Sequence, residues 1–532
     1  MSMRCVISLV LLKLLLCASP AVAEHCFANP ICEQADPWIT QYQGRYLACF
    51  SEANRAISIQ MSDRLTVLGA RHVVWTAPES GPASREIWAP ELHLLGGRWY
   101  IYFAASDGRN KNHRAWVVQS SGSDPLGPYS LHGPLYTGDD PDLSSNNRWA
   151  IDLTVYESEH RLYAIWSGWR DDQDIQYLYI APMNDPLTIA APRTRLCAND
   201  DFLWERVDES PRGRGLNEAP EVLQHDGRTF VTYSCSGSWE PSYKIGLLEL
   251  KRGSDPLQST NWHKYPMPAF ESTETTYGVG HNSFVKSPDG AEDWLIYHAK
   301  LDRQEGWRRA VFAQPFTWSD DGLPKFGRPI AAGQPIPVPS GEYDHCVTGA
   351  RRFQFLGAND LDGWSYFGHH QLLHLDGGKL CLGELRGPPI NEFRSGEKVV
   401  FDGGLWTNFT LTATLWLLEQ HGQSGLLFRV NTPFVGYNGQ HGYFAGIDSD
   451  NKCLVLGFTD GKVWHQIASA PLTEPVGTKC EMKITAHQNQ FEIDLNGNRL
   501  LQAQDGTFDS GSVGLRVVDT HAAFSDVQIT PL

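Results

Sequence analysis

The sequence predicts an all-β protein, a five-bladed β-propeller followed by a β-sandwich of the jelly-roll type. Short strand-like runs alternate with clusters of Gly, Pro, Asp and Asn, and helical periodicity is nearly absent. Five segments in the first two thirds of the chain share one pattern, as the blades of a propeller do. Beyond residue 340 this pattern stops, and strands with plain apolar and polar alternation continue to the end.

The five repeated segments each open with an acid or a histidine, continue through a polar turn and end in an aromatic and β-branched run. They span residues 35–51, 87–106, 149–169, 216–239 and 278–300. Their opening residues, roughly 55 to 66 positions apart, are Asp36, Glu91, Asp152, Glu218 and His281. Equivalent positions of the inner strands of a propeller converge on its central axis. We therefore expect a ring of titratable groups around one pocket.

The domain organisation follows from the length and from where the repeats end. A chain of 532 residues is too long for one core of ordinary size, so two domains are expected. We assign residues 24–340 to the propeller and residues 341–532 to an accessory sandwich, with strands such as 409–418. Three prolines favour an extended connector between the two domains, and they are Pro335, Pro337 and Pro339.

The N-terminus has the pattern of a secretory signal peptide over residues 1–23. Arg4 supplies the basic region, residues 6–18 supply an apolar core, and Ala21-Val22-Ala23 fits the cleavage rule. A retained membrane anchor is the alternative, although the apolar run is short for a membrane span. We expect a mature chain that begins at Glu24 and is secreted, or periplasmic in a bacterium.

Charge and cysteine content limit the possible partners and the compartment of the protein. The formal net charge of −17 argues against nucleic acid and against an anionic membrane as partners, and it is compatible with a neutral polysaccharide. In an oxidising compartment Cys26–Cys32 and Cys453–Cys480 are plausible disulfides. The sequence does not determine the connectivity of the remaining cysteines.

The acids of the repeats suit the hydrolysis of a glycosidic bond. This reaction needs two carboxyl groups in different protonation states, one to protonate the leaving oxygen and one to activate water or to attack directly. Asp36, Asp152 and Glu218 are the candidates. The third carboxylate would raise the pKa of the acid and keep it protonated near neutral pH.

At these residues the chain resembles glycoside hydrolase family 43, five-bladed propeller enzymes that act on arabinose- and xylose-containing polysaccharides. The resemblance spans about residues 30–335. It implies that Asp36 in Ala-Asp-Pro is the general base, that Asp152 in WAIDLT modulates the pKa of the acid, and that Glu218 in LNEAPE is the general acid. It also implies an inverting mechanism. The chain departs from the family pattern at three positions, which are Leu153, Ala219 and Phe312.

The resemblance also implies roles for residues around the acids. Trp88 could form the floor of the sugar site or could belong to the core, and we leave Glu91 structural. His298 and Arg309 are candidate substrate-binding residues, and Arg309 could replace the arginine that the family usually has where Phe312 stands. In relatives a histidine at the place of His281 often orients a hydrated calcium ion. We therefore expect no cofactor for the chemistry and a structural calcium ion in the propeller axis, with a satisfied core histidine as the alternative.

The C-terminal part resembles concanavalin-like sandwiches, including the family-66 carbohydrate-binding modules. The segments that carry this resemblance are GLLFRV (425–430), GYFAGID (442–448) and residues 511–529. Tyr443, Asp448 and Trp464 are candidates to line a sugar site. The alternative is a module that only shields the propeller and its linker.

These observations together predict a secreted inverting glycosidase, an α-L-arabinofuranosidase acting on plant cell-wall arabinan or arabinoxylan. A β-xylosidase is the first alternative, because relatives with that activity share the three acids. A family-32 fructan hydrolase is a second, but its Arg-Asp-Pro and Glu-Cys motifs are missing at Asp152 and Glu218. A sugar-binding propeller without activity is a third, and the presence of all three carboxyl groups argues against it.

Overall fold

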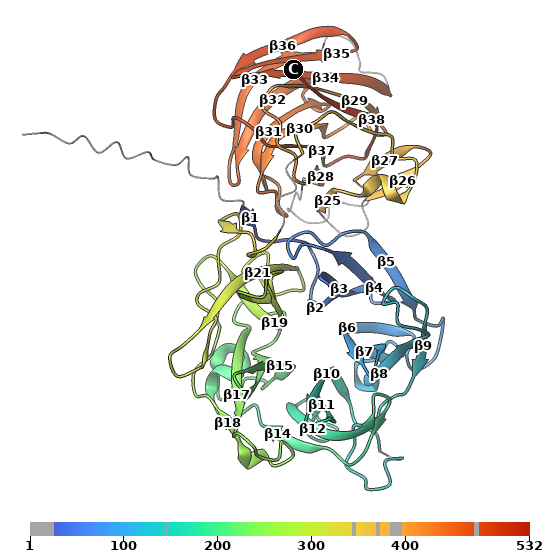
Figure 1. Cartoon of the computed structure of the whole chain (residues 1–532), viewed down its shortest axis with the longest axis vertical. Coiled ribbons are helices and arrows are strands. Elements are labelled where there is room, and N and C mark those ends of the chain that lie inside the picture. Colours follow the sequence, from blue (N-terminus) through green and yellow to red (C-terminus); the bar gives the residue numbers. More distant parts are fainter. Residues whose placement is uncertain (1–25, 145, 343–346, 369–372, 384–395, 473–477) are drawn as a thin grey trace, which may run out of the picture.

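The computed structural model describes residues 26–144, 146–342, 347–368, 373–383, 396–472 and 478–532 (Figure 1). The expected signal peptide at 1–23 lies outside the described residues. The prediction of an all-β fold with a five-bladed propeller and a C-terminal sandwich is confirmed, and the helices of the described chain are single 3-10 turns. In this described part no helix has the length and apolarity needed to span a bilayer.

The five blades are antiparallel sheets whose strands follow chain order from the axis outward (Figure 1). Blade 1 consists of β2 (Trp38–Tyr42), β3 (Arg45–Glu52), β4 (Ala56–Ser62) and β5 (Arg71–Thr76). Blade 2 consists of β6 (Arg85–Leu95), β7 (Arg98–Ser106), β8 (Arg114–Ser120) and β9 (Tyr129–His132). Blade 3 consists of β10 (Ala150–Ser158), β11 (Arg161–Trp169), β12 (Gln176–Asp185), β13 (Thr188–Ile189) and β14 (Thr194–Cys197). Blade 4 consists of β15 (Asn217–His225), β16 (Arg228–Cys235), β17 (Lys244–Leu250) and β18 (Trp262–Lys264), and blade 5 of β19 (Tyr277–Lys286), β20 (Asp293–Lys300), β21 (Arg309–Trp318) and β22 (Pro324–Lys325).

The second strand of each blade is buried on both faces, because each blade packs between two neighbours. In β7 every residue after Arg98 is buried, and the run is aromatic and aliphatic without alternation. Trp99, Trp166 and Trp294 are among the largest fully buried side chains. Continuous apolar runs are typical of strands covered on both sides, so this pattern holds the five blades together and leaves the axis to the inner strands.

The ring closes through the N-terminal segment, which pairs with the end of the propeller. The short strand β1 (Cys26–Ala28) is antiparallel to β23 (Pro335–Pro337). The backbone N–H of Ile31 donates to the carbonyl of Val311 at 2.9 Å. The side chain of Asn29 both donates to and accepts from the backbone of Ala313, at 2.9 Å each. These bonds fix the segment before Asp36 against blade 5.

Each blade has a residue in the left-handed region on its inner strand or, in blade 1, two residues before that strand. These residues, with φ between 44° and 53°, are Asp36, Ala89, Asp152, Ala219 and His281. In β6, β10, β15 and β19 the pairing register shifts across this residue, which is the mark of a β-bulge. The expected equivalence of all five opening residues is therefore wrong for two. Glu218 precedes its bulge residue by one position, and Glu91 follows its own by two.

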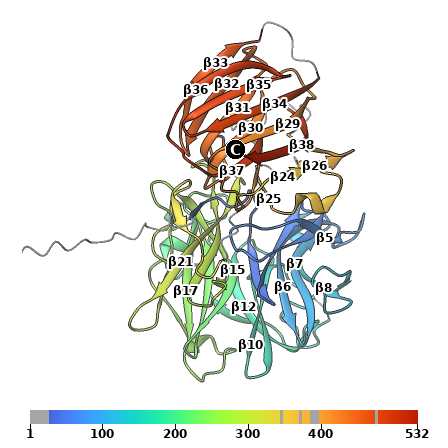
Figure 2. The ribbon, with the colours of Figure 1, turned by 45° about the horizontal axis from the view of Figure 1, so that its top comes forward.

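The sandwich packs a seven-stranded sheet on an eight-stranded sheet (Figure 2). The first contains β25 (Trp364–Phe367), β28 (Lys398–Phe401), β37 (Ser512–Val518), β30 (Gln423–Asn431), β31 (His441–Asp448), β32 (Cys453–Asp460) and β33 (Trp464–Pro471). The second contains β26 (Leu373–Asp376), β27 (Lys379–Leu382), β38 (Ala522–Pro531), β29 (Phe409–Leu417), β34 (Lys479–His487), β35 (Gln490–Leu495), β36 (Asn498–Gln504) and β24 (Arg351–Phe353). The strict alternation of β29 buries every second residue and builds one core between the sheets.

The sandwich lies beyond blades 1 and 5, next to β1 (Figures 1 and 2). Arg64 of blade 1 forms an ion pair with Asp402 of the sandwich. The backbone N–H of Val435 donates to the carbonyl of Pro30 at 3.2 Å. Between the two parts lies a cavity of about 220 Å³.

Two expectations about individual residues are wrong. The disulfides Cys26–Cys32 and Cys453–Cys480 are not formed, since Cys32, Cys453 and Cys480 are free. Tyr443 cannot stack on a sugar, because it is fully buried against Phe428 and donates to Asp505 at 2.6 Å. The alternation of β31 points this side chain into the core, which its aromatic type does not reveal.

Candidate active site

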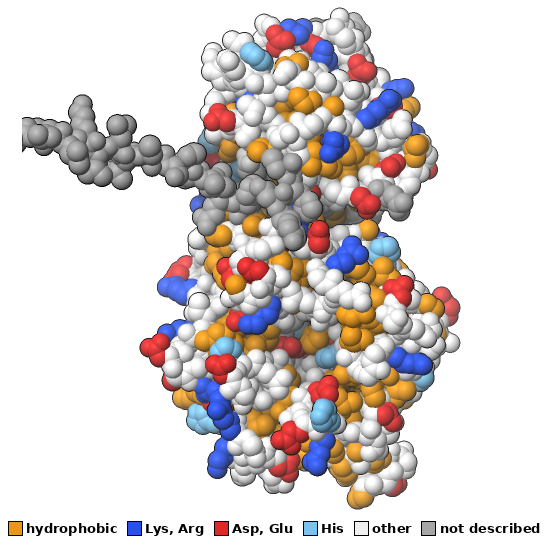
Figure 3. All heavy atoms as spheres, viewed as in Figure 1, with side chains coloured by type: hydrophobic (Ala, Val, Ile, Leu, Met, Phe, Trp, Pro, Cys, Tyr) orange, Lys and Arg blue, Asp and Glu red, His pale blue; other side chains and the backbone are white. Residues whose placement is uncertain are grey.

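A pocket of about 720 Å³ opens on the propeller axis, a volume typical of small-ligand sites. All five blades contribute to it, and acidic and histidine side chains are visible near the centre of the propeller face (Figure 3). Of the residues singled out in the sequence, six line this pocket, and they are Asp36, Trp88, Asp152, Glu218, His281 and Arg309. His298 lies against Asp36, behind the pocket wall.

Asp36 sits among three nitrogen-bearing side chains. Its Oδ1 lies 2.9 Å from Nη1 of Arg309 and 3.2 Å from Nδ1 of His281. Burial alone would raise the pKa of Asp36, but Arg309 and His281 outweigh it and hold that pKa well below its ordinary value. Asp36 is therefore an ionised carboxylate throughout the neutral and mildly acidic range.

The two histidines beside Asp36 differ in charge. Burial, helped by Arg309, lowers the pKa of His298 to about 3, so this ring is neutral. Its Nδ1 accepts the backbone N–H of Asp36 at 3.2 Å, which fixes the left-handed turn there. For His281 burial acts in the opposite direction to its neighbours, and Asp36 and Asp152 raise its pKa above the ordinary value. The carboxylates thus favour the protonated form of His281, and His298 is an anchor for the backbone.

Asp152 ties the inner strands of blades 3 and 4 together. Its Oδ2 accepts the backbone N–H of Ala219 at 3.0 Å. Burial, followed among the raising effects by the charge of Asp36, raises the pKa of Asp152 to about 6. The carboxyl therefore gains its charge just below neutral pH, next to the bulge that carries Glu218.

Glu218 is the carboxyl group with a protonation state opposite to that of Asp36. Burial raises its pKa to about 7, and the charge of Asp152 adds to this more than that of Asp36 does. The hydroxyl of Tyr243 donates to Oε1 of Glu218 at 2.8 Å. A Cβ atom on Gly280 would lie 2.4 Å from the Tyr243 ring, so only glycine leaves room for this tyrosine.

One pocket thus contains a carboxylate that is ionised in the neutral and mildly acidic range and a carboxylic acid that stays protonated up to about neutral pH. Opposite pKa shifts in a pair of neighbouring carboxyl groups are what acid and base catalysis on one substrate requires. Glu218 is buried and the Asp36 side chain is 20% exposed, and this partial removal from solvent strengthens their mutual electrostatic effects. The arrangement suits the cleavage of an acetal bond between two sugar residues.

The walls of the pocket are aromatic. Trp88 stacks on His113 with ring centroids 4.0 Å apart, and Trp149 stacks on Trp169 at 5.0 Å. Trp239 and Trp307 line the side formed by blades 4 and 5. Sequence reasoning missed Tyr243, Trp239 and Trp307. They belong to loops between strands, and no periodic signal could have identified them.

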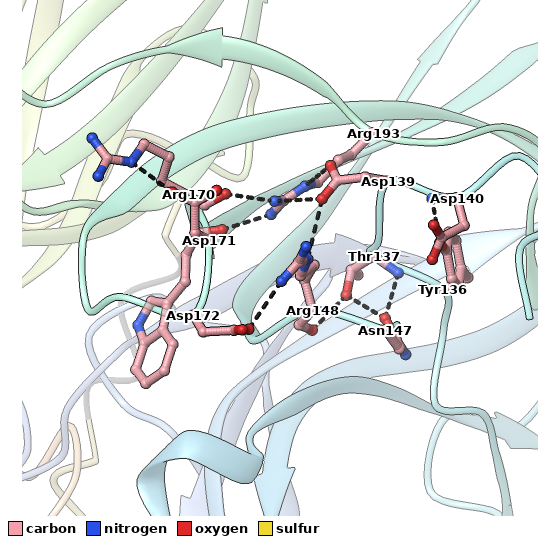
Figure 4. Close-up of polar contacts among 11 residues, drawn as sticks. Tyr136, Thr137, Asp139, Asp140, Asn147, Arg148, Arg170, Asp171, Asp172 and Arg193 are labelled. Atoms are coloured by element: carbon pink, nitrogen blue, oxygen red, sulfur yellow. Dashed lines mark hydrogen bonds and ion pairs between the residues drawn. The ribbon is translucent and has the colours of Figure 1, made fainter. Parts of the chain in front are cut away.

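A polar network braces the Trp149 wall (Figure 4). Arg193 donates to both carboxylate oxygens of Asp139, at 2.7 and 3.1 Å, and to the carbonyl of Trp169 at 2.8 Å. Arg148, the neighbour of Trp149, donates to the same Asp139 at 3.1 Å. The segment that leads into β10 and the end of β11 are therefore held by one carboxylate.

Glu91 lies outside the pocket, as a structural residue would. It is buried, and its Oε2 lies 3.0 Å from Nε2 of His93. Burial, with Glu221 as the next cause, raises the pKa of Glu91 well above the ordinary value. Glu91 and Glu221 are both buried, and they follow the bulges of β6 and β15 respectively.

The calcium expectation stays a prediction, and the donors do not favour direct coordination. The ligand atoms of Asp36, His281 and His298 lie within 4.8 Å of one another. Calcium prefers six to eight oxygen ligands, whereas this group offers one carboxylate and two imidazoles. Arg309 already forms an ion pair with the Asp36 carboxylate, and a protonated His281 would repel a dication.

Comparison with known sequences gives two family matches. The model of glycosyl hydrolases family 43 matches residues 27–324, more than half of the chain. A model described as a 3-keto-alpha-glucoside-1,2-lyase-like domain matches residues 355–530, so the concanavalin-like sandwich is present and this family describes it.

Individual relatives resemble part of the chain. The chain is 32% identical over 63% of its length to an extracellular exo-α-(1→5)-L-arabinofuranosidase of Streptomyces avermitilis, of which it covers 70%. It is 34% identical over 54% of its length to a protein of the same description from Streptomyces chartreusis, of which it covers 87%. The structure of an α-L-arabinofuranosidase from Lactobacillus brevis matches 57% of the chain and 98% of its own, with 31% identity and a TM-score of 0.53.

Three findings agree: the five-bladed propeller, the single pocket that Asp36, Asp152 and Glu218 line, and the family match over residues 27–324. The chain is a glycoside hydrolase and belongs to glycosyl hydrolase family 43.

Proposed function

We propose that this protein is a secreted, inverting α-L-arabinofuranosidase that releases arabinose from arabinan or arabinoxylan. The observation that carries the proposal is the opposite protonation of Asp36 and Glu218 in one pocket. The names of the relatives support the choice of sugar, since they are exo-α-(1→5)-L-arabinofuranosidases and α-L-arabinofuranosidases. The word extracellular in two of these names supports secretion.

In the proposed reaction Asp36 removes a proton from a water molecule, and that water attacks the anomeric carbon from one face of the sugar. Glu218 gives its proton to the glycosidic oxygen, so the bond between this oxygen and the anomeric carbon breaks. The water oxygen remains on the anomeric carbon with inverted configuration. Asp152 keeps the pKa of Glu218 high, and Tyr243 orients the acid.

The roles of the two carboxyl groups can be separated by leaving-group dependence. Asp36→Asn should abolish hydrolysis of arabinotriose and of nitrophenyl arabinofuranoside alike, because both need activated water. Glu218→Gln should lower kcat/KM at least about a hundredfold on arabinotriose. The loss should be much smaller on the nitrophenyl substrate, because its leaving group needs no proton. Glu79→Gln removes a charge from a carboxyl that is 97% exposed and serves as the matched control.

The stereochemical outcome provides an independent test. Proton NMR during early hydrolysis should show the β-anomer of arabinose first, followed by mutarotation. Initial release of the α-anomer would contradict inversion, and near-normal activity of both Asp36→Asn and Glu218→Gln would contradict the catalytic assignment.

A β-xylosidase remains the second candidate, because the three carboxyl groups serve either sugar. Wild-type rates on nitrophenyl arabinofuranoside, nitrophenyl xyloside, debranched arabinan and arabinoxylan, with products identified, decide between the two. Higher kcat/KM on the xyloside would replace the first proposal by the second.

For the sandwich we propose an accessory role, with a domain boundary near Gly341. Chains of 24–340 and of 24–532 should hydrolyse small arabinosides equally and differ on polymer if the sandwich binds glycan, since tethering raises the local substrate concentration. The junction contacts, such as the Arg64–Asp402 ion pair, are lost in the shorter chain. An insoluble shorter chain would instead indicate that the sandwich supports the propeller.

A further inference from the structure

Two tryptophans at the rim of the pocket have no role in the proposed chemistry. Trp307 is 64% exposed, although it is the largest apolar type of side chain. Its ring centroid lies 5.7 Å from that of Trp239, and the two ring planes are inclined by 55°. The backbone N–H of Gly306 donates to the carbonyl of Trp239 at 3.0 Å, so the two loops are fastened to each other. Both tryptophans line the same pocket as Glu218.

The pair lies on the side of the pocket that holds the proposed acid. Trp239 belongs to the loop between β16 and β17, which also carries Tyr243, the residue that donates to Glu218. Arg214, four residues before Glu218, places its guanidinium 5.5 Å from the centre of the Trp239 ring. Trp239 therefore packs on the arginine that precedes the acid's strand and shares a loop with the tyrosine that orients the acid.

Trp307 extends this surface toward blade 5. It belongs to the loop between β20 and β21 and stands two residues before Arg309. The guanidinium of Arg309 lies 5.4 Å from the centre of its ring. Each ring of the pair is thus packed by an arginine, and most of the Trp307 side chain remains exposed to solvent.

A general acid protonates the oxygen that leaves, so the leaving part of the substrate lies on the acid's side. The C–H faces of a pentose ring are apolar, so they can pack on aromatic side chains without burying unpaired polar groups. We propose that Trp239 and Trp307 form the binding site for the sugar residue on the leaving-group side of the scissile bond. The ligand class is a neutral pentose ring of an oligosaccharide or polysaccharide chain. This inference rests on the proposed function, because that function defines which side the leaving group occupies.

A purely structural role for Trp307 makes a different prediction. If the ring only supports Arg309, its removal disturbs Asp36 and slows every substrate to the same extent. If the ring binds the leaving sugar, its removal slows only substrates that have a sugar there. Two substrates with the same arabinosyl group therefore separate the roles, arabinotriose and methyl α-L-arabinofuranoside, whose leaving group has no ring.

The experiment measures kcat/KM of full-length wild type, Trp307→Ala, Trp239→Ala and Trp307→Phe on both substrates. Each alanine variant should lose about tenfold on arabinotriose, mainly through KM, and less than twofold on the methyl glycoside. Trp307→Phe keeps an aromatic face and should retain most of the arabinotriose activity. Met267→Ala truncates a side chain that is 69% exposed and lies outside the pocket, and it should match wild type on both.

Equal losses on the two substrates, or no loss on either, overturn the inference while the proposed function stands. Loss of structure is excluded by the methyl glycoside, whose hydrolysis requires a folded site. A wild type that cleaves xylosides and not arabinosides refutes the proposed sugar, and the same ratio is then measured with xylotriose and methyl β-xyloside. A wild type inactive on all four substrates overturns both proposals.

Discussion

The backbone N–H of Ala219 donates to Oδ2 of Asp152 at 3.0 Å, across the boundary between blades 3 and 4. Ala219 is the left-handed residue of its bulge, and Glu218 directly precedes it. Asp152 therefore acts on Glu218 in two ways. Its charge raises the pKa of the acid, and its carboxylate oxygen holds the backbone from which the acid projects.

The pH dependence of wild type should have one limb near neutrality. Because Glu218 must carry a proton and its pKa is about 7, kcat/KM on arabinotriose should fall as pH rises through 7. The pKa of Asp36 lies well below its ordinary value, so the base remains ionised and causes no loss between pH 5 and 6. A pH–rate profile checks this. A loss of activity centred near pH 5 on the acid side would contradict the state assigned to Asp36.

Two substitutions separate the effects of Asp152. Asp152→Asn removes the charge but keeps an oxygen that can accept the N–H of Ala219. The pKa of Glu218 should fall, so the alkaline limb of the profile should move to lower pH with a modest loss at pH 5. Asp152→Ala removes the acceptor as well, and kcat should fall further at every pH, because the bulge beside the acid loses its support. Identical profiles of the two variants would show that the backbone bond contributes nothing.

Tyr243 should tune the acid in the opposite direction. Its hydrogen bond to Glu218 lowers the pKa of that carboxyl, so Tyr243→Phe should shift the alkaline limb to higher pH and reduce kcat about tenfold. Gly280→Ala should be more damaging, since its Cβ would lie 2.4 Å from the Tyr243 ring and would displace it. The measurement is the pH profile of both variants. Wild-type activity of Gly280→Ala would contradict the close packing.

The sequence predicted the fold because the five repeats have their own strand pattern and each bears a polar residue near its start. It predicted that Asp36, Asp152 and Glu218 would line one pocket. It could not predict their register, because a bulge inserts one residue and the period of two along a strand does not show where. Loop residues such as Trp307 follow no period, and Tyr443 has the same type and spacing whether it faces the core or a ligand.

Removal of metal ions tests the axial calcium. Arg309 already pairs with Asp36, and the pKa of His281 is raised, so we expect a dication to bind poorly at this cluster. Dialysis against EDTA should therefore leave kcat/KM within twofold and Tm unchanged, and added calcium should have no effect. A Tm that falls with EDTA and recovers with calcium would instead establish a stabilising ion, since a ligand of the folded state raises stability.

Removal of Arg193 should destabilise the network around Asp139 far more than removal of Arg148. The Arg193 side chain is 2% exposed, and its loss leaves the carbonyls of Trp169 and Arg170 without a donor. Arg193→Ala should therefore lower the free energy of unfolding by about 3 kcal/mol. The Arg148 side chain is 26% exposed, and its removal should cost no more than about 1 kcal/mol.

The same pair of variants tests whether the brace shapes the pocket. Trp149 lines the pocket and stacks on Trp169, so a displaced Trp169 should raise KM for arabinotriose in Arg193→Ala, with kcat less affected. Arg148→Ala should keep the wild-type KM. Denaturant unfolding and steady-state kinetics on the two proteins decide. An Arg193→Ala protein with lowered stability and an unchanged KM would mean that the network supports the blade without positioning the Trp149 wall.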